Sequence, residues 1–378
     1  MEVIPPVRSK IILALLLSLT VFFIVGCWDV QEINRRVSTN ALFFDVDSTG
    51  KIRMGTVFSV PGTLLPPVIG TQQQFEKRNY LITAEDTSIT DAWSKLQAKS
   101  ERDIFFGQLR AIVLTENAAR GDINNLLDFI GRIPSVPPNT VVLVTKDDPK
   151  ELLDMKNESN NIPGNYIDLF FQTPTKETLA IPIDLWRVLA QMDNKTSDPH
   201  LPLIKASEGS YDISGTALFS DNHLVGELDL EETKTLALLK GSSSGYLTVP
   251  LKNGEYVAFK DVKAKSVITP KLDDNGKVAF GITTKVTGVI VETNPRKMEL
   301  TEEDKRIISS HAEMEIQNKI GNLFIKLQSL NSDAVGLGEK FRVKYPGEWQ
   351  KENWRQIYPN CLINMETRFI IARTGLFR

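Results

Sequence analysis

The sequence predicts a mixed α/β (α+β) protein of three consecutive domains, each a sheet flanked by helices. Strand-like and helix-like segments alternate from residue 80 to residue 154, and such alternation implies a sheet that helices cover. A polar stretch with a proline, DNKTSDPH at 193–200, separates this section from a second one. A long amphipathic helix near the C-terminal end indicates a third section. The predicted parts are a leader at 1–26 and domains at 27–200, 201–275 and 276–378.

The leader is typical of a bacterial lipoprotein signal peptide. Arg8 and Lys10 precede an apolar run that is too short to cross about 30 Å of hydrocarbon, which takes roughly 20 helical residues. The run ends in a motif that resembles a lipobox, in which small residues precede a cysteine whose thiol receives a diacylglyceryl group: Ile24, Val25, Gly26 and Cys27. We therefore expect a thioether anchor at Cys27. A signal anchor, or a secretory peptide with a chance cysteine, is the alternative.

The composition is that of an ordinary globular protein. The chain has 44 basic and 47 acidic residues, a net charge of −3, so no basic excess exists to hold nucleic acid. With Cys27 acylated, Cys361 has no partner, and an extracytoplasmic chain with one thiol lacks a disulfide framework. We expect Cys361 to be a small buried hydrophobe.

In the first section, two strand-like runs, ALFFDV and KIRMGTVFSV, flank Asp47-Ser48-Thr49-Gly50 and predict a hairpin. A calcium loop is the alternative, but Thr56 stands where its bidentate glutamate belongs. Residues 61–79 contain three prolines and two glycines and predict a long connection without regular structure. Its apolar side chains have no element to bury them, so we expect a partner contact, with a mobile crossover as the alternative: Leu64, Leu65, Val68 and Ile69.

The rest of the first section alternates strands and helices. The strand YLITA precedes a helix over Thr87 to Glu101, for which Asp86 is available as the cap. Strand LRAIVLTE, helix NAARGDINNLLDFIGR, strand TVVLVTK and helix DPKELLDM follow in turn. Two amphipathic pieces, GNYIDLFF and IPIDLWRVLAQM, then lead to the boundary at 193–200.

The second section contains strands LPLIKASE and YDISGTALFS and the helix LEETKTLALLK. The third begins with two alternating runs that flank Asn275-Gly276, a strong hairpin signal. The segment 301–330 predicts one long helix with an apolar stripe that must lie along a sheet or a partner. YPGEWQKENWRQIYPN predicts a short helix that carries Trp349 and Trp354, and CLINMETRFII predicts the last strand. The stripe recurs at intervals of three and four residues: Ile308, Ala312, Ile316, Ile320, Leu323, Leu327 and Leu330.

The sequence contains no recognisable catalytic, metal or cofactor site, so we predict that the chain is not an enzyme. His200, His223 and His311 lack the spacing of metal ligands and are expected at the surface or in packing. The GSSSG segment at 241–245 matches a nucleophile elbow, but that motif needs a strand before it and a helix after it, so a flexible turn is expected. Carboxylate pairs at 231–232 and 302–303 begin helices, where they favour the helix dipole.

The segment GCWDVQEINRR resembles the start of the Ger(x)C family of spore germination lipoproteins. YLITAEDTSITDAWSKL, RDIFFGQLRAIVLTE and LLDFIGRIPSVPPN are similar to the N-terminal domain of that family. GTALFSDNHLVGELDLEET resembles the start of its C-terminal region, and YPGEWQKENWRQIYPN with RFIIARTG resembles its close. The resemblance covers nearly everything from Gly26 to Gly375. Gln108 departs from the histidine that relatives often carry, whereas Arg132 matches the family's arginine.

The resemblance implies a non-catalytic C subunit of a nutrient germinant receptor, held by its lipid on the outer face of the spore inner membrane. Such a subunit is needed for assembly and signalling with two membrane partners, the A and B subunits, and the B subunit is thought to sense the germinant. Trp28 and Asp29 follow the lipidated cysteine and are interface candidates, because an exposed tryptophan favours the membrane interface. The alternative for Asp29 is a solvated charge or a sorting determinant.

Two other classes of protein are alternatives to a germinant receptor subunit. A solute-binding lipoprotein of an ABC transporter has the same kind of anchor, but it requires two similar α/β lobes with a cleft. A cell-wall hydrolase requires paired carboxylates or a metal site in one pocket. Three unequal sections with one long helix favour the germinant receptor subunit over both.

Overall fold

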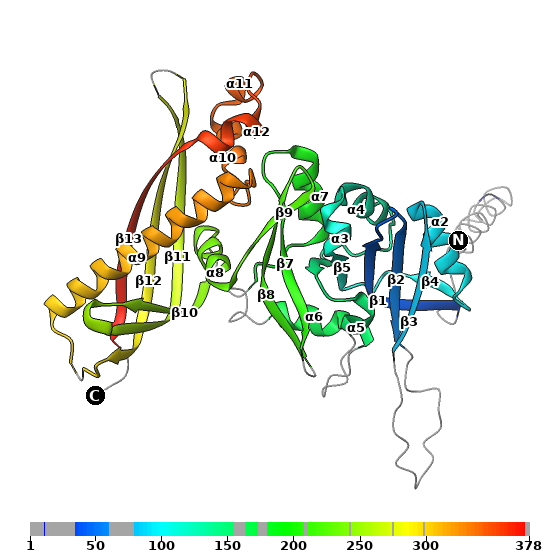
Figure 1. The fold of residues 1–378 in the computed structure, drawn as a ribbon, viewed down its shortest axis with the longest axis horizontal. Helices are drawn as coiled ribbons and strands as arrows, with labels where there is room; N and C mark the ends of the chain where they lie inside the picture. The colour runs from blue at the N-terminus through cyan, green and yellow to red at the C-terminus, as the bar shows by residue number, and fades with distance from the viewer. Residues whose placement is uncertain are drawn as a thin grey trace, which may run out of the picture.

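The computed structural model describes two sheets and the helices that pack on them (Figure 1). The sheets lie side by side along the long axis of the molecule, and helix α8 (Leu230–Leu239) lies between them. The residues that the structure describes are Ile11 and 35–59, 79–154, 163–172, 180–207, 210–241, 243–273, 276–297 and 299–374.

The first sheet has the strand order β3-β2-β1-β5-β6-β7-β8-β9, with β4 paired to β1. Strands β1, β5, β6 and β7 are mutually parallel, and the outer strands are antiparallel. The central strands read AIVLT and VVLVT because a parallel sheet is buried on both faces. The strands are β1 Arg36–Val46, β2 Ile52–Ser59, β3 Asn79–Asp86, β4 Asp103–Phe105, β5 Ala111–Thr115, β6 Val141–Thr145, β7 His200–Ser207, β8 Ser210–Ser220 and β9 His223–Leu228.

Helices cover both faces of this sheet. Helices α2 (Ile89–Ala98), α3 (Glu116–Arg120), α4 (Ile123–Gly131) and α7 (Leu185–Asn194) pack on the face that carries Leu42 and Ile112. Helices α5 (Pro149–Asp154) and α6 (Pro163–Phe171) pack on the other face, which carries Phe43 and Val113. Helix α2 is capped by Ser88, whose hydroxyl accepts from Asp91 N at 3.0 Å, and not by Asp86 as the sequence suggested.

The second sheet has the order β10-β11-β12-β13 and packs on the long helix α9. Strands β12 and β13 are parallel, so the chain crosses between them through α9 to α12 along one face. The apolar stripe of α9 is buried against the sheet from Ile308 to Leu327. This burial confirms the prediction that the stripe lies along a sheet or a partner. The elements are β10 Ser243–Pro250, β11 Tyr256–Leu272, β12 Val278–Asn294, α9 Glu302–Ser329, α10 Leu337–Lys344, α11 Pro346–Trp349, α12 Trp354–Ile357, η5 Tyr358–Asn360 and β13 Leu362–Thr374.

The structure confirms the mixed α+β class and corrects the expectation of a separate sheet in each of three sections. Strands β7, β8 and β9 extend the first sheet, because β7 pairs in parallel with β6 at Leu203 and Ile204. Leu203 belongs to the core on one face and Ile204 to the core on the other, so β7 is an interior strand of that sheet. The domain boundaries at 200 and 275 stay a prediction.

The two predicted hairpins agree with the structure. Asp47 Oδ1 accepts from the N–H groups of Thr49 and Lys51 at 2.8 and 2.9 Å, which closes the predicted β1–β2 hairpin. The β11–β12 pairing and the positive φ of Gly276 (76°) confirm the second hairpin. Helix α9 is capped by Thr301, and Cys361 is buried as expected. The single helix predicted around Trp349 and Trp354 is two short helices, α11 and α12.

Candidate functional site

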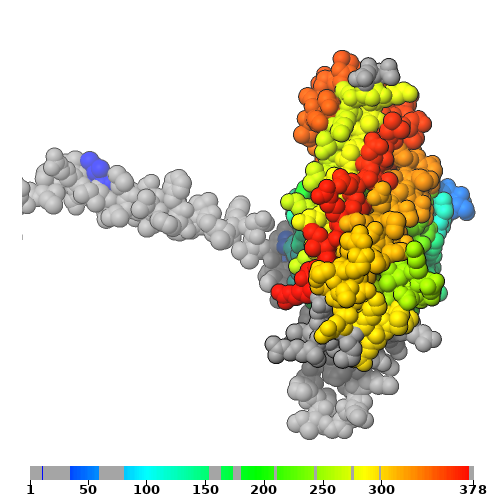
Figure 2. Space-filling view, turned by 90° about the vertical axis from the view of Figure 1, so that its left-hand side faces the viewer, coloured from blue at the N-terminus to red at the C-terminus, as the bar shows by residue number. Residues whose placement is uncertain are grey.

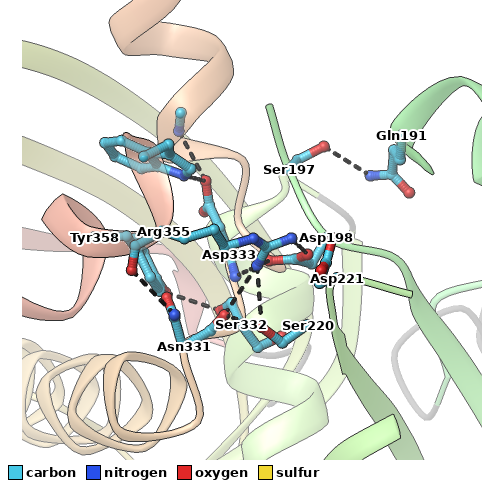
Figure 3. A network of polar contacts seen from close by, with 12 residues as sticks. Gln191, Ser197, Asp198, Ser220, Asp221, Asn331, Ser332, Asp333, Arg355 and Tyr358 are labelled. Atoms are coloured by element: carbon cyan, nitrogen blue, oxygen red, sulfur yellow. Dashed lines mark hydrogen bonds and ion pairs between the residues drawn. The ribbon is translucent and has the colours of Figure 1, made fainter. Parts of the chain in front are cut away.

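A buried polar network joins the two sheets, and we call it the inter-sheet network (Figure 3). The first sheet contributes the segment before β7 and the end of β8. The second contributes the turn after α9 and helices α10 and α12. The network consists of the backbone carbonyl groups of Asn331 and Ser332 and the side chains of Asp198, Ser220, Asp333, Trp354, Arg355 and Tyr358.

Arg355 is the cation of the inter-sheet network. Its Nη1 donates to Asp198 Oδ2 at 2.7 Å, and its Nη2 donates to Asp198 Oδ1, so the pair is bidentate. The same Nη1 lies 3.1 Å from Ser220 Oγ and 3.1 Å from the carbonyl oxygen of Asn331. A bidentate guanidinium–carboxylate contact fixes orientation as well as distance. Arg355 therefore holds the start of β7, the end of β8 and the turn after α9 together.

Asp333 is the second carboxylate of the inter-sheet network and caps the start of α10. Its oxygens accept from the backbone N–H groups of Gly336, Leu337 and Gly338 at 2.7 to 2.9 Å. They also accept from Trp354 Nε1 at 3.2 Å. Asp333 is only 1% exposed, so these hydrogen bonds are buried. Orphan N–H groups at a helix start favour a negative charge there.

The two aspartates are hydrogen-bonded to each other. Asp198 N donates to the carbonyl oxygen of Asp333 at 3.0 Å, and Asp333 N donates to Asp198 Oδ2 at 2.7 Å. Tyr358 Oη donates to the carbonyl oxygen of Ser332 at 2.9 Å, so the turn after α9 is also bonded to η5. Outside the network, Lys326 of α9 pairs with Glu232 of α8 at 2.6 Å.

Burial sets the protonation of these groups. Burial raises the pKa of Asp333 to about 6, against the lowering by its backbone N–H partners. Burial lowers the pKa of Arg355, but the hydrogen bonds and charge of Asp198 outweigh it, so that pKa is raised. Burial, helped by the charge of Lys240, holds the pKa of His200 well below its ordinary value, so this ring is neutral. His200 is thus a packing residue, as expected.

The inter-sheet network joins the two sheets through a buried ion pair. Removing one partner of a buried ion pair leaves an uncompensated charge, so the pair resists separation strongly. In the part of the chain that the structure describes, no group of three or more His, Cys, Asp and Glu side chains is placed to hold a metal ion. Across the same residues, no helix is both long enough and apolar enough to cross a bilayer.

The sequence-predicted site residues lie outside the described part of the chain. This holds for the lipobox and anchor, for the two residues after them and for the apolar positions of the 61–79 connection: Ile24, Val25, Gly26, Cys27, Trp28, Asp29, Leu64, Leu65, Val68 and Ile69. Their roles stay predictions. Gln108 is exposed, and Arg132 pairs with Asp128 of its own helix at 2.7 Å.

Sequence reasoning missed the inter-sheet network. Asp198 lies in the stretch that was interpreted as a domain boundary, and it contacts Asp333 and Arg355 across 135 and 157 residues. No spacing rule links such positions. The sequence carried no local signal for the network, because Asp198 lies in a polar stretch and Trp354 and Arg355 lie in a segment that predicts a short helix.

Two family descriptions match the chain in succession. "Spore germination protein N-terminal domain" matches residues 29–206, and "Spore germination B3/ GerAC like, C-terminal" matches residues 214–375. The boundary between the two matches falls within the β7–β8 hairpin of the first sheet.

Several proteins are similar to this chain over almost its whole length. Spore germination protein B3 of Bacillus subtilis (strain 168) is 23% identical over 360 residues, covering 93% of this chain and 94% of its own. Spore germination protein GerQC of Bacillus cereus is 20% identical and covers 97% of this chain and 98% of its own. The crystal structure of the GerBC protein has the same fold, with a TM-score of 0.59 and 19% identity, and covers 88% of this chain and 96% of its own.

The order of the two matched regions, their coverage and the shared fold agree with the segments in which the sequence resembled one family. The chain belongs to the Ger(x)C family of spore germination proteins.

Proposed function

We propose that this chain is the non-catalytic C subunit of a nutrient germinant receptor. In this proposal Cys27 carries a diacylglyceryl anchor that holds the body on the outer face of the spore inner membrane. The body assembles with the A and B membrane subunits and takes part in germination signalling. The similarity of this chain to relatives named spore germination proteins B3, KC and A3 supports a role in such a receptor.

The observation that carries the proposal is the inter-sheet network. Arg355 ties the second sheet to the first because its Nη1 lies 2.7 Å from Asp198 Oδ2 and 3.1 Å from Ser220 Oγ, and its Nη2 donates to Asp198 Oδ1. A subunit that connects other subunits needs two contact surfaces on one mechanically continuous body. The bidentate pair between Arg355 and the buried Asp198 supplies that continuity.

The partner contacts belong to segments that the structure does not describe. We propose that Trp28 and Asp29 lie at the membrane interface beside the lipid. The apolar residues of the 61–79 connection are the proposed protein contact of the first section: Leu64, Leu65, Val68 and Ile69.

Replacement of the anchor cysteine tests the proposal. Cys27→Ala removes the thiol that the lipid would occupy, so we expect the protein to leave the membrane fraction and germination through this receptor to be lost. Cys361→Ala is the matched control, because that thiol is buried and should leave localisation unchanged. Spores that keep Cys27→Ala protein in the inner membrane and germinate normally would contradict the anchor.

A further inference from the structure

One face of the second sheet is not covered by a helix anywhere in the described part of the chain. Alternate residues of β12, such as Phe280, Ile282 and Val286, point into the core under α9 and α10. The residues between them point the opposite way. We call this second set the open face: Lys263, Lys265, Val267, Thr269, Lys271, Ala279, Gly281, Thr283, Lys285, Thr287, Leu362, Asn364, Glu366, Arg368 and Ile370.

The strand pairing places these residues side by side in rows. Thr287 of β12 lies between Lys263 of β11 and Ile370 of β13. Figure 2 shows the end of the molecule that carries β13, drawn in red, which lies at the surface between α9 and the strands in yellow. The open face therefore continues to the exposed edge of the sheet.

The open face is basic in a chain whose net charge is −3. Its one carboxylate, Glu366, pairs with Arg368 at 2.8 Å on the same strand. Among the described residues, no ion pair neutralises the lysines of the face: Lys263, Lys265, Lys271 and Lys285. The positive charge of these four side chains is thus available to a partner.

One row of the open face works against the stability of the sheet. Lys285 is paired directly with Lys265 on one side and with Arg368 on the other. Neighbouring strands lie about 4.8 Å apart, and like charges directly opposite each other destabilise a sheet. Because Arg368 is already paired with Glu366, the uncompensated repulsion in this row is between Lys265 and Lys285, and an anionic partner would relieve it.

Apolar side chains lie among these cations. Val267, Leu362 and Ile370 are 55%, 59% and 44% exposed, and all three are on the open face. Basic residues interspersed with exposed aliphatic ones are the composition of surfaces that lie on lipid head groups.

The shape of the open face distinguishes a lipid surface from a compact ligand. The cations extend from Lys263 to Lys271, roughly 27 Å along β11 at about 3.4 Å per residue, and across three strands. Four of the five are lysines, which act as point charges and do not need the fixed geometry of one bound phosphate. A long, mostly lysine strip fits many dispersed head groups.

We propose that the open face docks on an anionic phospholipid bilayer, with lysines at the phosphates and the aliphatic side chains at the head-group boundary. This contact is separate from the lipid at Cys27 and does not require it. It sets the orientation of the second sheet relative to the membrane, which a lipid on one residue does not determine.

Vesicle binding of a chain that lacks the anchor tests the proposal. The three hydrophobic cores are built from residues between Val37 and Ile371, so a chain that begins at Trp28 retains them. We expect it to co-sediment with phosphatidylcholine vesicles that contain about 30% phosphatidylglycerol, and not with phosphatidylcholine alone. Binding should weaken as salt rises, because the screening length falls from about 10 Å at 0.1 M to about 3 Å at 1 M.

Neutralising three lysines of the open face tests which residues bind the vesicles. The triple variant Lys263→Gln, Lys265→Gln, Lys285→Gln should lower the partition coefficient about 100-fold, because each lysine near an anionic surface contributes about a factor of five. The matched control is Lys51→Gln, Lys150→Gln, Lys205→Gln, which removes the same charge from exposed lysines of the first sheet and its helices and should bind like the parent.

Three outcomes would overturn the proposal. They are no binding of the parent chain to anionic vesicles at low salt, equal losses in the two triple variants, and binding that does not distinguish neutral from anionic lipid. Unchanged vesicle binding by the open-face variant belongs to the second of these outcomes, and loss of receptor assembly when the same substitutions are made in the full chain would then assign the face to an acidic protein. The chain used here has no Cys27, so failure of this experiment leaves the anchor hypothesis untouched.

Discussion

Replacing Arg355 with methionine tests whether the inter-sheet network holds the body together. The change removes the guanidinium and keeps most of the apolar length of the side chain, so it isolates the ion pair. Asp198 is 2% exposed in its side chain and would lose its cation, whereas Arg355 is 28% exposed. Breaking a buried pair costs about 3–5 kcal/mol, and the partial exposure of Arg355 places the expected loss near the low end, about 3 kcal/mol.

A double-mutant cycle separates the pair from the packing of the side chain. Asp198→Asn removes the uncompensated charge, so the double variant Arg355→Met, Asp198→Asn should be more stable than the sum of the single losses predicts, with a coupling of about 2 kcal/mol. Equilibrium urea unfolding measures these free energies. The control is Arg132→Met, whose pair with Asp128 is exposed and should cost less than about 0.5 kcal/mol. A loss for Arg355→Met as small as the control's, or additive single losses, would refute the reasoning.

Three further predictions concern Asp333, Gly338 and the 61–79 connection. Because the folded-state pKa of Asp333, about 6, lies above its ordinary value of 3.8, the folded state binds more protons than the unfolded state between these values. The free energy of unfolding of the parent should therefore fall relative to Asp333→Asn as the pH rises from 4 to about 6, and a pH-independent difference would contradict this. Gly338→Ala places a Cβ 2.6 Å from the carbonyl oxygen of Thr196 and should lose about 1–3 kcal/mol in urea unfolding, whereas Gly347→Ala, with open space, should stay close to the parent. Deletion of residues 63–74 should leave the circular dichroism spectrum intact and abolish co-purification with the A and B subunits; a deletion variant that still assembles makes the segment a connector only.

The elements that the sequence predicted correctly depend on short-range information. The stripe from Ile308 to Leu327 repeats every three or four residues, and that spacing alone forces one face of a helix to be apolar. The two hairpins depend on their turn residues, such as Asp47 with its own side-chain hydrogen bonds. Each of these signals lies within one helix or one turn, so tertiary contacts do not change the structure that it predicts.

The sheet assignment and the inter-sheet network depend on long-range pairing. The polar stretch around Asp198 has the same local sequence pattern in a solvated linker and in a buried contact. It is buried in this fold because Arg355, which is distant in the sequence, pairs with Asp198. Strand β7 follows that stretch, so it was placed in a new domain, although it pairs with β6. Alternating patterns specify that a strand exists and which face is apolar, but they do not specify its neighbour.

Isolation of the chain's partners from the spore inner membrane tests the central claim most directly. The protein, affinity-tagged at its C-terminal end and extracted in mild detergent, should bring down the A and B subunits of one germinant receptor. The Cys27→Ala variant, expressed at the same level, serves as the background. Recovery of transporter permeases in place of the receptor subunits would contradict the account and support a solute-binding lipoprotein.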